Sequence, residues 1–226
     1  MATMPSTARA IVAGIALIQA VSTANDFRPA RLTDGAPPPL PALATGGGQV
    51  VLQVSVNRAG QVADVTPLVS TPPFTEFMVR AVRGWQFQAA EDVVQAGASA
   101  STQSRERVES NVLVVGVFRP PALLGPTLGE QPKQVHVASI DMAFPERIDM
   151  PPYPMNAFTP GVVLVEARLG VDGKVVDASA VNAAPPFDAV AVTATREAAF
   201  RPAHVRGRAV ASRVYIVFGF AQPVGS

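Results

Sequence analysis

Few side chains in this chain of 226 residues belong to the types that perform catalysis or bind metal ions. There is no cysteine, which excludes disulfides, zinc–thiolate sites and thiol nucleophiles. The two histidines, His136 and His204, have no cysteine, histidine or carboxylate at the spacing of metal ligands. We therefore expect two surface histidines and no metal site.

Other candidates for chemistry lack the surroundings that the chemistry requires. Asp141, Glu146 and Asp149 are a conceivable acid–base group, but they lie in a connector rich in proline and methionine, without a rigid scaffold. The serines between residues 99 and 104 have neither a Gly-x-Ser-x-Gly context nor a nearby histidine. The glycines at 46–48 precede a strand and not a helix, so they do not form a phosphate-binding loop. We predict that the chain is not an enzyme and binds no cofactor; an undetected hydrolase is the alternative.

The C-terminal third of the chain has the residue pattern of one complete small domain. Apolar and polar residues alternate over 162–171, Asp172-Gly173 favours a tight hairpin turn, and the alternation resumes over 174–181. Over 187–200 the apolar residues recur with the period of a helix, and over 210–220 they alternate again. The predicted order is strand, strand, helix, strand.

Chain direction limits how these elements can be arranged. The third strand is parallel to the second and antiparallel to the first, so placing it beside the first gives the order 2-1-3. This arrangement has a right-handed crossover and one helix covering one face. The second and third strands are then edges, and exposed edges are either protected or used.

The same residues resemble the C-terminal domain of the TonB family, periplasmic proteins that contact outer-membrane receptors. The family pattern runs from a Tyr-Pro start through a strand, an Asp-Gly turn, a second strand and a Leu-Asp type of helix start. It ends the helix with an aromatic-Arg-Phe-x-Pro-Ala type of segment before a last apolar strand. The matching residues are Tyr153-Pro154, Gly161, Val171-Asp172-Gly173, Phe187-Asp188 and Phe200-Arg201-Pro202-Ala203.

An upstream segment repeats this pattern. The first copy lacks the Tyr-Pro start, and its last strand, 108–118, aligns with 210–220 only if residues 91–107 form a longer polar loop. We infer a duplication, because fixed turn and strand positions rarely recur by chance. A shift of 113 residues superposes, without a gap, Gly48 on Gly161, Gly60 on Gly173, Pro72-Pro73-Phe74 on Pro185-Pro186-Phe187, and Phe87 on Phe200.

The predicted fold class is α+β, with two tandem ββαβ domains like the TonB C-terminal domain. Each is expected to be a three-stranded antiparallel or mixed sheet with one helix. Both are near the lower size limit for independent stability, so they are expected to lean on one another. Residues 134–140 are a candidate short strand in the second linker. The divisions are a signal peptide or short anchor (1–24), a Pro/Gly-rich linker (25–47), the first domain (48–120), a Pro-rich linker (121–150) and the second domain (151–226).

The resemblance implies a function and a site. In the family, a short receptor segment adds itself as a strand beside the final strand; main-chain groups supply affinity and alternate side chains select the partner. The chain is thus expected to be a periplasmic protein-binding module that captures a peptide of an outer-membrane or envelope protein, with TonB-dependent transport as one setting. The partner-binding residues expected from the resemblance are Arg213, Val214, Tyr215, Ile216, Val217, Phe218, Tyr153 and Pro154.

Alternatives stay open. The alternative to a peptide-binding module is a structural envelope adaptor that binds protein or peptidoglycan and has no energy-transducing role. The alternative to a free final edge is an edge closed by the other copy, which gives one six-stranded sheet. A homodimer is a further alternative. The arginines at 201, 206, 208 and 213 are either a solvated face or a positive rim for an acidic peptide or cell-wall polymer. A net charge of +1, without basic runs interleaved with aromatics, argues against nucleic acid.

The N-terminus has the features of an export signal. Arg9 precedes an apolar run over 10–21, and Ser22-Thr23-Ala24 suits signal peptidase. A spanning helix needs nearer to about 20 residues, so we predict cleavage after Ala24 and a periplasmic location. The alternative is an inner-membrane anchor facing the periplasm, the one case with a membrane contact. The family's anchor usually carries a histidine that couples it to a proton-driven motor, and no histidine precedes His136 here.

N-terminal sequencing of the protein recovered from its native cell envelope is expected to start at or near Asn25. An intact Met1 or Ala2 terminus in the membrane fraction would instead indicate the anchor and favour an energy-transducing role.

Overall fold

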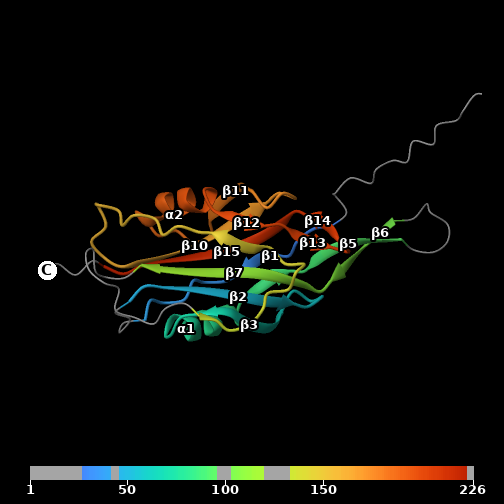
Figure 1. The fold of residues 1–226 in the computed structure, drawn as a ribbon, viewed down its shortest axis with the longest axis horizontal. Helices are drawn as coiled ribbons and strands as arrows, with labels where there is room; N and C mark the ends of the chain where they lie inside the picture. Colours follow the sequence, from blue (N-terminus) through green and yellow to red (C-terminus); the bar gives the residue numbers. More distant parts are fainter. Residues whose placement is uncertain (1–26, 42–45, 96–102, 120–132, 223–226) are drawn as a thin grey trace, which may run out of the picture.

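The computed structural model describes residues 27–41, 46–95, 103–119 and 133–222. A seven-stranded sheet lies at its centre, with one helix on each side (Figure 1). The chain is therefore a mixed α+β protein with a mostly antiparallel sheet. The spatial order of the strands is β11, β10, β15, β7, β2, β3 and β8. The predicted signal peptide or anchor at 1–24 lies outside the described residues.

The first half of the chain, up to residue 119, supplies three strands of this sheet, and the segment that follows supplies β8. Strand β2 pairs antiparallel with both β3 and β7, which gives the predicted order 2-1-3. Strand β8 adds antiparallel to Val69 and Ser70 at the end of β3. The bounds are β2 Gly48–Val56, β3 Val62–Ser70, α1 Phe74–Val82, β7 Ser110–Arg119 and β8 Lys133–Gln134.

The second half supplies the other three strands, β10 Gly161–Leu169, β11 Val175–Ala180 and β15 Ser212–Phe220, and helix α2 Phe187–Arg196. Strand β10 pairs antiparallel with β11 and β15, again in the order 2-1-3. The two halves join through a parallel ladder between β15 and β7. The expectation of a separate three-stranded sheet in each half is therefore wrong, because the two last strands pair with each other.

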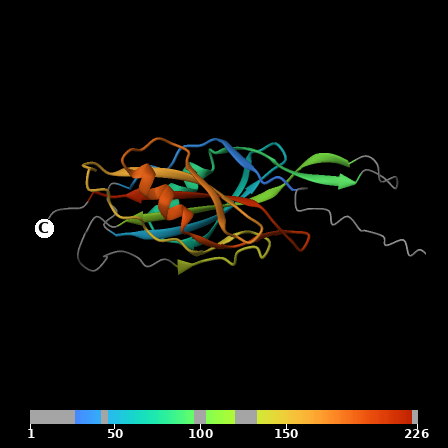
Figure 2. The same ribbon diagram turned by 90° about the horizontal axis from the view of Figure 1, so that it is seen from above.

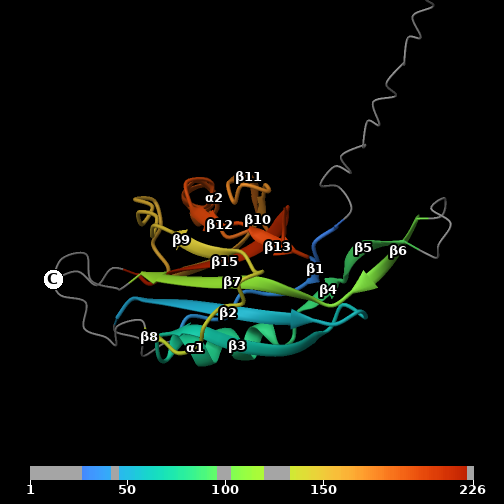
Figure 3. The ribbon, with the colours of Figure 1, turned by 45° about the vertical axis from the view of Figure 1, so that its right-hand side comes forward.

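Short two-stranded sheets flank the central one. Strand β1 (Arg31–Asp34) pairs with β4 (Gln86–Gln88), and β9 (Phe144–Arg147) pairs with β12 (Ala199–Arg201). Two hairpins precede the last strands of the two halves, and β5–β6 projects from the body of the molecule (Figure 3). Of residues 91–107, expected to be a polar loop, 91–95 and 103–107 instead belong to the strands of this hairpin, and 96–102 lie outside the described residues. The hairpins are β5 Ala90–Gln95 with β6 Gln103–Val108, and β13 Ala203–Val205 with β14 Arg208–Val210.

The middle of the sheet is apolar on both faces, so the four inner strands β10, β15, β7 and β2 bury side chains on each face. In β10, Val163 and Val165 belong to the core under α2, whereas Leu164 belongs to the core on the α1 side. Figure 2 shows α2, in orange, over the strands of its own half. The residues near Leu32 complete the α1-side core beyond the reach of α1, and those near Met142 do the same for the other face.

The segment expected to be a Pro-rich linker is thus part of the fold where it is described. Met142 and Ala143 are buried, and β8 and β9 both come from this segment. The short strand expected over 134–140 is reduced to β8, because residues 135–143 leave the edge of the sheet to cross its face. Chain connections of this kind replace a helix as a cover for apolar strands.

Two glycines fix the turns that follow β2 and β10. Gly60 and Gly173 have φ of +84° and +79°, a region that glycine occupies without steric cost. A Cβ at either position would overlap the carbonyl oxygen of Phe87 or Phe200, so each turn packs closely on the strand that follows the helix. The predicted hairpin turns at both positions are confirmed.

Phe200 and Phe87, at corresponding places after the two helices, are buried in the two cores. Phe200→Ala is expected to lower the free energy of unfolding by about 3–5 kcal/mol, because truncation leaves a cavity. Phe87→Ala is expected to cost a similar amount. Urea denaturation measures both, and Phe158→Ala, which truncates an exposed phenylalanine, is the control. An unchanged midpoint for Phe200→Ala would contradict its assignment to the core.

Candidate functional site

Strand β15, where the partner-binding residues were expected, is an interior strand of the sheet. It pairs with β10 on one side and with β7 on the other. Main-chain groups from Val214 onward are therefore used on both sides, and strand addition at this edge is excluded by the fold. The open alternative, in which the other copy closes the edge, is the arrangement found.

The side chains of this strand are also inaccessible. Residues 214–218 are 0% exposed, with alternate members in the two cores. Sequence alternation located the strand correctly but could not show that both of its faces are covered. Tyr215 and Val217, two of the expected partner-binding residues, instead pack on the α1 side.

Tyr215 links three parts of the molecule. Its hydroxyl donates to the Glu166 carboxylate at 3.0 Å and accepts the Leu32 N–H at 2.7 Å. Arg213 forms an ion pair with the same carboxylate, and Trp85 and Phe87 contact the tyrosine ring edge-on. Burial raises the pKa of the Tyr215 hydroxyl, and the Glu166 charge raises it further. The group is therefore a neutral structural anchor for the N-terminal segment.

Tyr153 packs against the last residue of β15 and does not lie beside the expected binding residues 213–218. The Tyr153 ring packs edge-on against Phe187 and Phe220, and its hydroxyl donates to the Thr159 carbonyl at 2.8 Å. Tyr153 thus covers the end of the α2-side core.

The outer edges of the sheet are β11 and the β3–β8 pair, and they differ. In the first half, the chain itself adds to β3: β8 pairs with Val69 and Ser70, and the Val135 N–H donates to the Leu68 carbonyl at 2.9 Å. The ring of His136 donates to the Pro67 carbonyl at 2.7 Å. Within the described residues, no strand pairs with the outer edge of β11.

The last residues of β11 carry the accessible part of this edge. The Val181 N–H donates to the Leu164 carbonyl, so the main-chain groups of Val181 point toward β10 and those of its neighbour Ala180 point away from it. The main-chain groups of Ala178 also point away from β10, but this residue is buried against the core under α2. Ala180 is half-buried, and Val181 is 44% exposed. An added strand would therefore pair at Ala180 and beyond.

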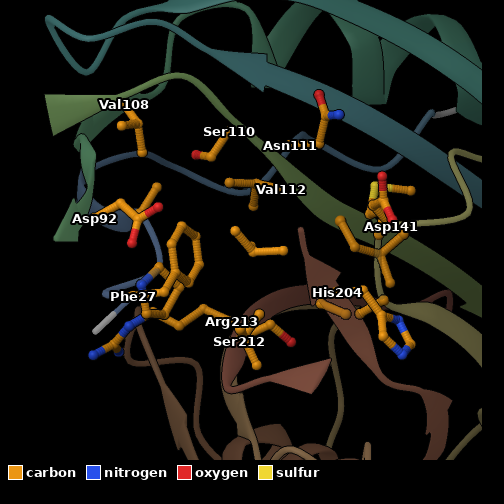
Figure 4. A pocket seen from close by; sticks show the side chains of 18 of the residues that line it. Phe27, Asp92, Val108, Ser110, Asn111, Val112, Asp141, His204, Ser212 and Arg213 are labelled. Atoms are coloured by element: carbon orange, nitrogen blue, oxygen red, sulfur yellow. The ribbon is translucent and has the colours of Figure 1, made fainter. Parts of the chain in front are cut away.

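A cavity of about 370 Å³ lies where β7 and β15 separate. The ladder between them starts at Leu113 and Val214, although the strands start at Ser110 and Ser212. Figure 4 shows Ser110 and Val112 facing Ser212 and Arg213 across it. We call this cavity the slot. Its other lining comes from Phe27, Pro29 and Ala30, from Asp141 to Ala143, and from the hairpins β5–β6 and β13–β14.

The arginines that formed a candidate positive rim are largely neutralised or bonded within the chain. Arg206 pairs with Asp92 at 2.8 Å, and Arg201 donates to the carbonyls of Ser139 and Met142. Arg213 pairs with Glu166. Two of the four charges are thus neutralised by carboxylates, whereas Arg201 and Arg208 have no ion-pair partner among the described residues.

Neither a metal site nor a membrane span is found within the ranges that the structure describes: no three His, Asp or Glu side chains cluster, and no helix there is long and apolar enough to cross a membrane. No protein-family model matches the chain, and no curated protein matches it. The open end of β11 and the slot are thus the two features on which a function can be argued.

Tyr215→Phe is expected to lower the free energy of unfolding by about 1–3 kcal/mol at pH 7, because a buried donor and a buried carboxylate each lose a partner. Since the folded pKa is raised, this tyrosine stabilises the fold at neutral pH and its contribution falls as pH rises above about 10, the unfolded value. The difference between the two proteins should therefore narrow at pH 11. Urea unfolding of the unmodified protein and of Tyr215→Phe at both pH values measures this difference. A difference that does not narrow would contradict the raised pKa.

Proposed function

We propose that this chain is a duplicated TonB-like protein-binding module of the cell envelope, which captures an extended peptide of an envelope partner by strand addition at the end of β11. The observation that carries the proposal is the contrast between two corresponding edges. One edge already holds an added strand from the chain itself, and the other is open.

Element positions support the duplication. Strands β2 and β10 begin at Gly48 and Gly161, and the helices begin at Phe74 and Phe187, so both pairs are 113 residues apart. The flanking strands β1 and β9, and also β4 and β12, keep the same offset at both ends. The parallel β7–β15 pair, with the helices on opposite faces, is the geometry expected of two like units related by a two-fold axis along the strands (Figure 1).

The β3 edge shows how strand addition works on this scaffold. Pro67 pairs with Leu52, and Ala180 pairs with Val165, the residues that correspond through the repeat. Pro67 has no N–H to offer, and its outward carbonyl accepts a hydrogen bond from His136. Ala180 keeps both main-chain groups, and no hydrogen bond to them is found among the described residues. The second half therefore retains a donor and an acceptor that the first half has lost or used.

The surroundings of Ala180 indicate which peptides fit. Val181 and Val176 are exposed apolar residues of the strand and its end, 44% and 67% exposed. An added strand places alternate side chains on each face, so one row of the peptide would contact Val181. Main-chain bonds would supply much of the affinity, and a β-branched or aromatic residue opposite Val181 would add to it.

Ala180→Pro tests the proposal, because it copies Pro67 of the first half into the corresponding place. Proline at an outward edge position leaves the ladder to β10 intact, so the variant is expected to fold with a similar melting temperature. The amount of partner that it captures is expected to fall at least about tenfold, since the outward N–H is removed. The measurement is recovery of envelope partners, identified by mass spectrometry, on the immobilised mature protein.

Two further variants separate edge pairing from other effects. Val181→Ala keeps every main-chain group and is expected to weaken capture only a few-fold. Val137→Ala, at an exposed valine of the segment beside the closed β3 edge, is the matched control. If a folded Ala180→Pro protein captures the same partners as the unmodified chain, the end of β11 is not the binding site.

A further inference from the structure

The slot between β7 and β15 has features of a binding site that the strand edge does not explain. Ser110 to Val112 pair with β2, and Ser212 and Arg213 pair with β10, but these residues do not pair with each other. Two strand segments therefore face one another across the slot with one side of each main chain unpaired. At about 3.3 Å per residue, the unpaired part of β7 is roughly 10 Å long.

Polar side-chain atoms in the slot also lack partners. The Ser110 and Ser212 hydroxyls and the Arg213 Nε are buried, and none has a hydrogen-bond partner among the described residues. Leaving such groups unsatisfied costs stability, so a guest that bonds to them gains that free energy back. Both hydroxyls can donate or accept, which suits a guest that carries N–H and C=O groups.

The shape of the slot limits what can enter. It ends blindly where the Leu113–Val214 pair begins, so an extended chain cannot pass through it. Its faces are covered by the segments that contain Ala30 and Met142, which are both buried. The hairpins form its outer part, where the Asp92–Arg206 ion pair joins them. A chain end, and not a chain middle, fits such a space.

The charges of the lining select one of the two chain ends. Its arginines, Arg206 and Arg213, are both paired with carboxylates. Glu109 and Asp141 also line the slot, and neither has an ion-pair partner in the part of the chain that the structure describes. The uncompensated charge is therefore negative, which favours an ammonium group over a carboxylate.

From these observations we propose that the slot binds the free amino-terminal end of an extended peptide, over about three residues. The main chain of the peptide bonds to the unpaired segments at Ser110–Val112 and Ser212–Arg213. Its ammonium group is attracted by the Asp141 carboxylate, and Glu109, which precedes Ser110, adds negative charge at the outer end of the slot. This site is separate from the end of β11, and neither needs the other.

The test uses the full-length protein and two probes that differ only at the amino terminus: Ala-Ala-Ala-NH₂ and its N-acetylated form. Titration is followed by NMR of the backbone amides. The free amine is expected to shift the signals of residues 110–113 and 212–214 with saturation, and the acetylated form to bind at least about tenfold more weakly. Absence of saturable shifts at these residues, or equal binding of the two probes, would overturn the proposal.

Variants assign the contacts. Ser110→Val with Ser212→Val removes both hydroxyls and places two methyl groups on each Cβ; it is expected to abolish binding while raising the melting temperature. Asp141→Asn, at an exposed residue, is expected to weaken binding of the free-amine probe about two- to fivefold and to leave binding of the acetylated probe unchanged. Ala180→Pro, at the β11 edge, should leave both probes unaffected, so this result and that of the partner-capture experiment are independent. Unchanged binding in a folded Ser110→Val, Ser212→Val protein would refute the assignment.

Discussion

The parallel ladder between β7 and β15 is the constraint on which the rest of the structure depends. Each of these strands is the last sheet strand of its half and would be an edge by itself. Pairing them satisfies two rows of main-chain groups at once and places both strands inside the sheet. Because the two helices then lie on opposite faces, neither helix covers the whole sheet. The remaining apolar surface on each face has to be covered by chain connections, which accounts for the buried residues near Leu32 and Met142.

Local features of the fold were predictable from the sequence. The turns at Gly60 and Gly173 follow from the need for positive φ, and the 2-1-3 order follows from chain direction and crossover hand. Helix α2 was placed from residue 187 by its apolar period, and Pro186 occupies its N-cap position. Asp188, in the first turn, accepts the N–H of Ala184, just before the helix. These predictions depend on contacts close in sequence.

The site could not be predicted for the same reason. The residue alternation in β15 fits an edge strand with one face exposed to solvent. The same alternation would be found in an interior strand between two cores. Only the position of β7, about a hundred residues away, decides between the two. The slot depends on that distant pairing as well, since it exists because the ladder begins at Leu113 and not at Ser110. The one signal for the slot in the sequence was a serine at the start of both strands, and a serine at a strand start is compatible with many other structures.

The same ladder has a consequence for how the chain reaches its native state. Leu113 and Val214 are partners although about a hundred residues separate them, so the ladder is a contact of high sequence separation. Such contacts lose more chain entropy before they form and tend to form late in folding. Until then, each half would expose an apolar edge strand that can pair with another molecule. Co-translational folding of the first half therefore has to tolerate an unprotected β7 until the second half is synthesised.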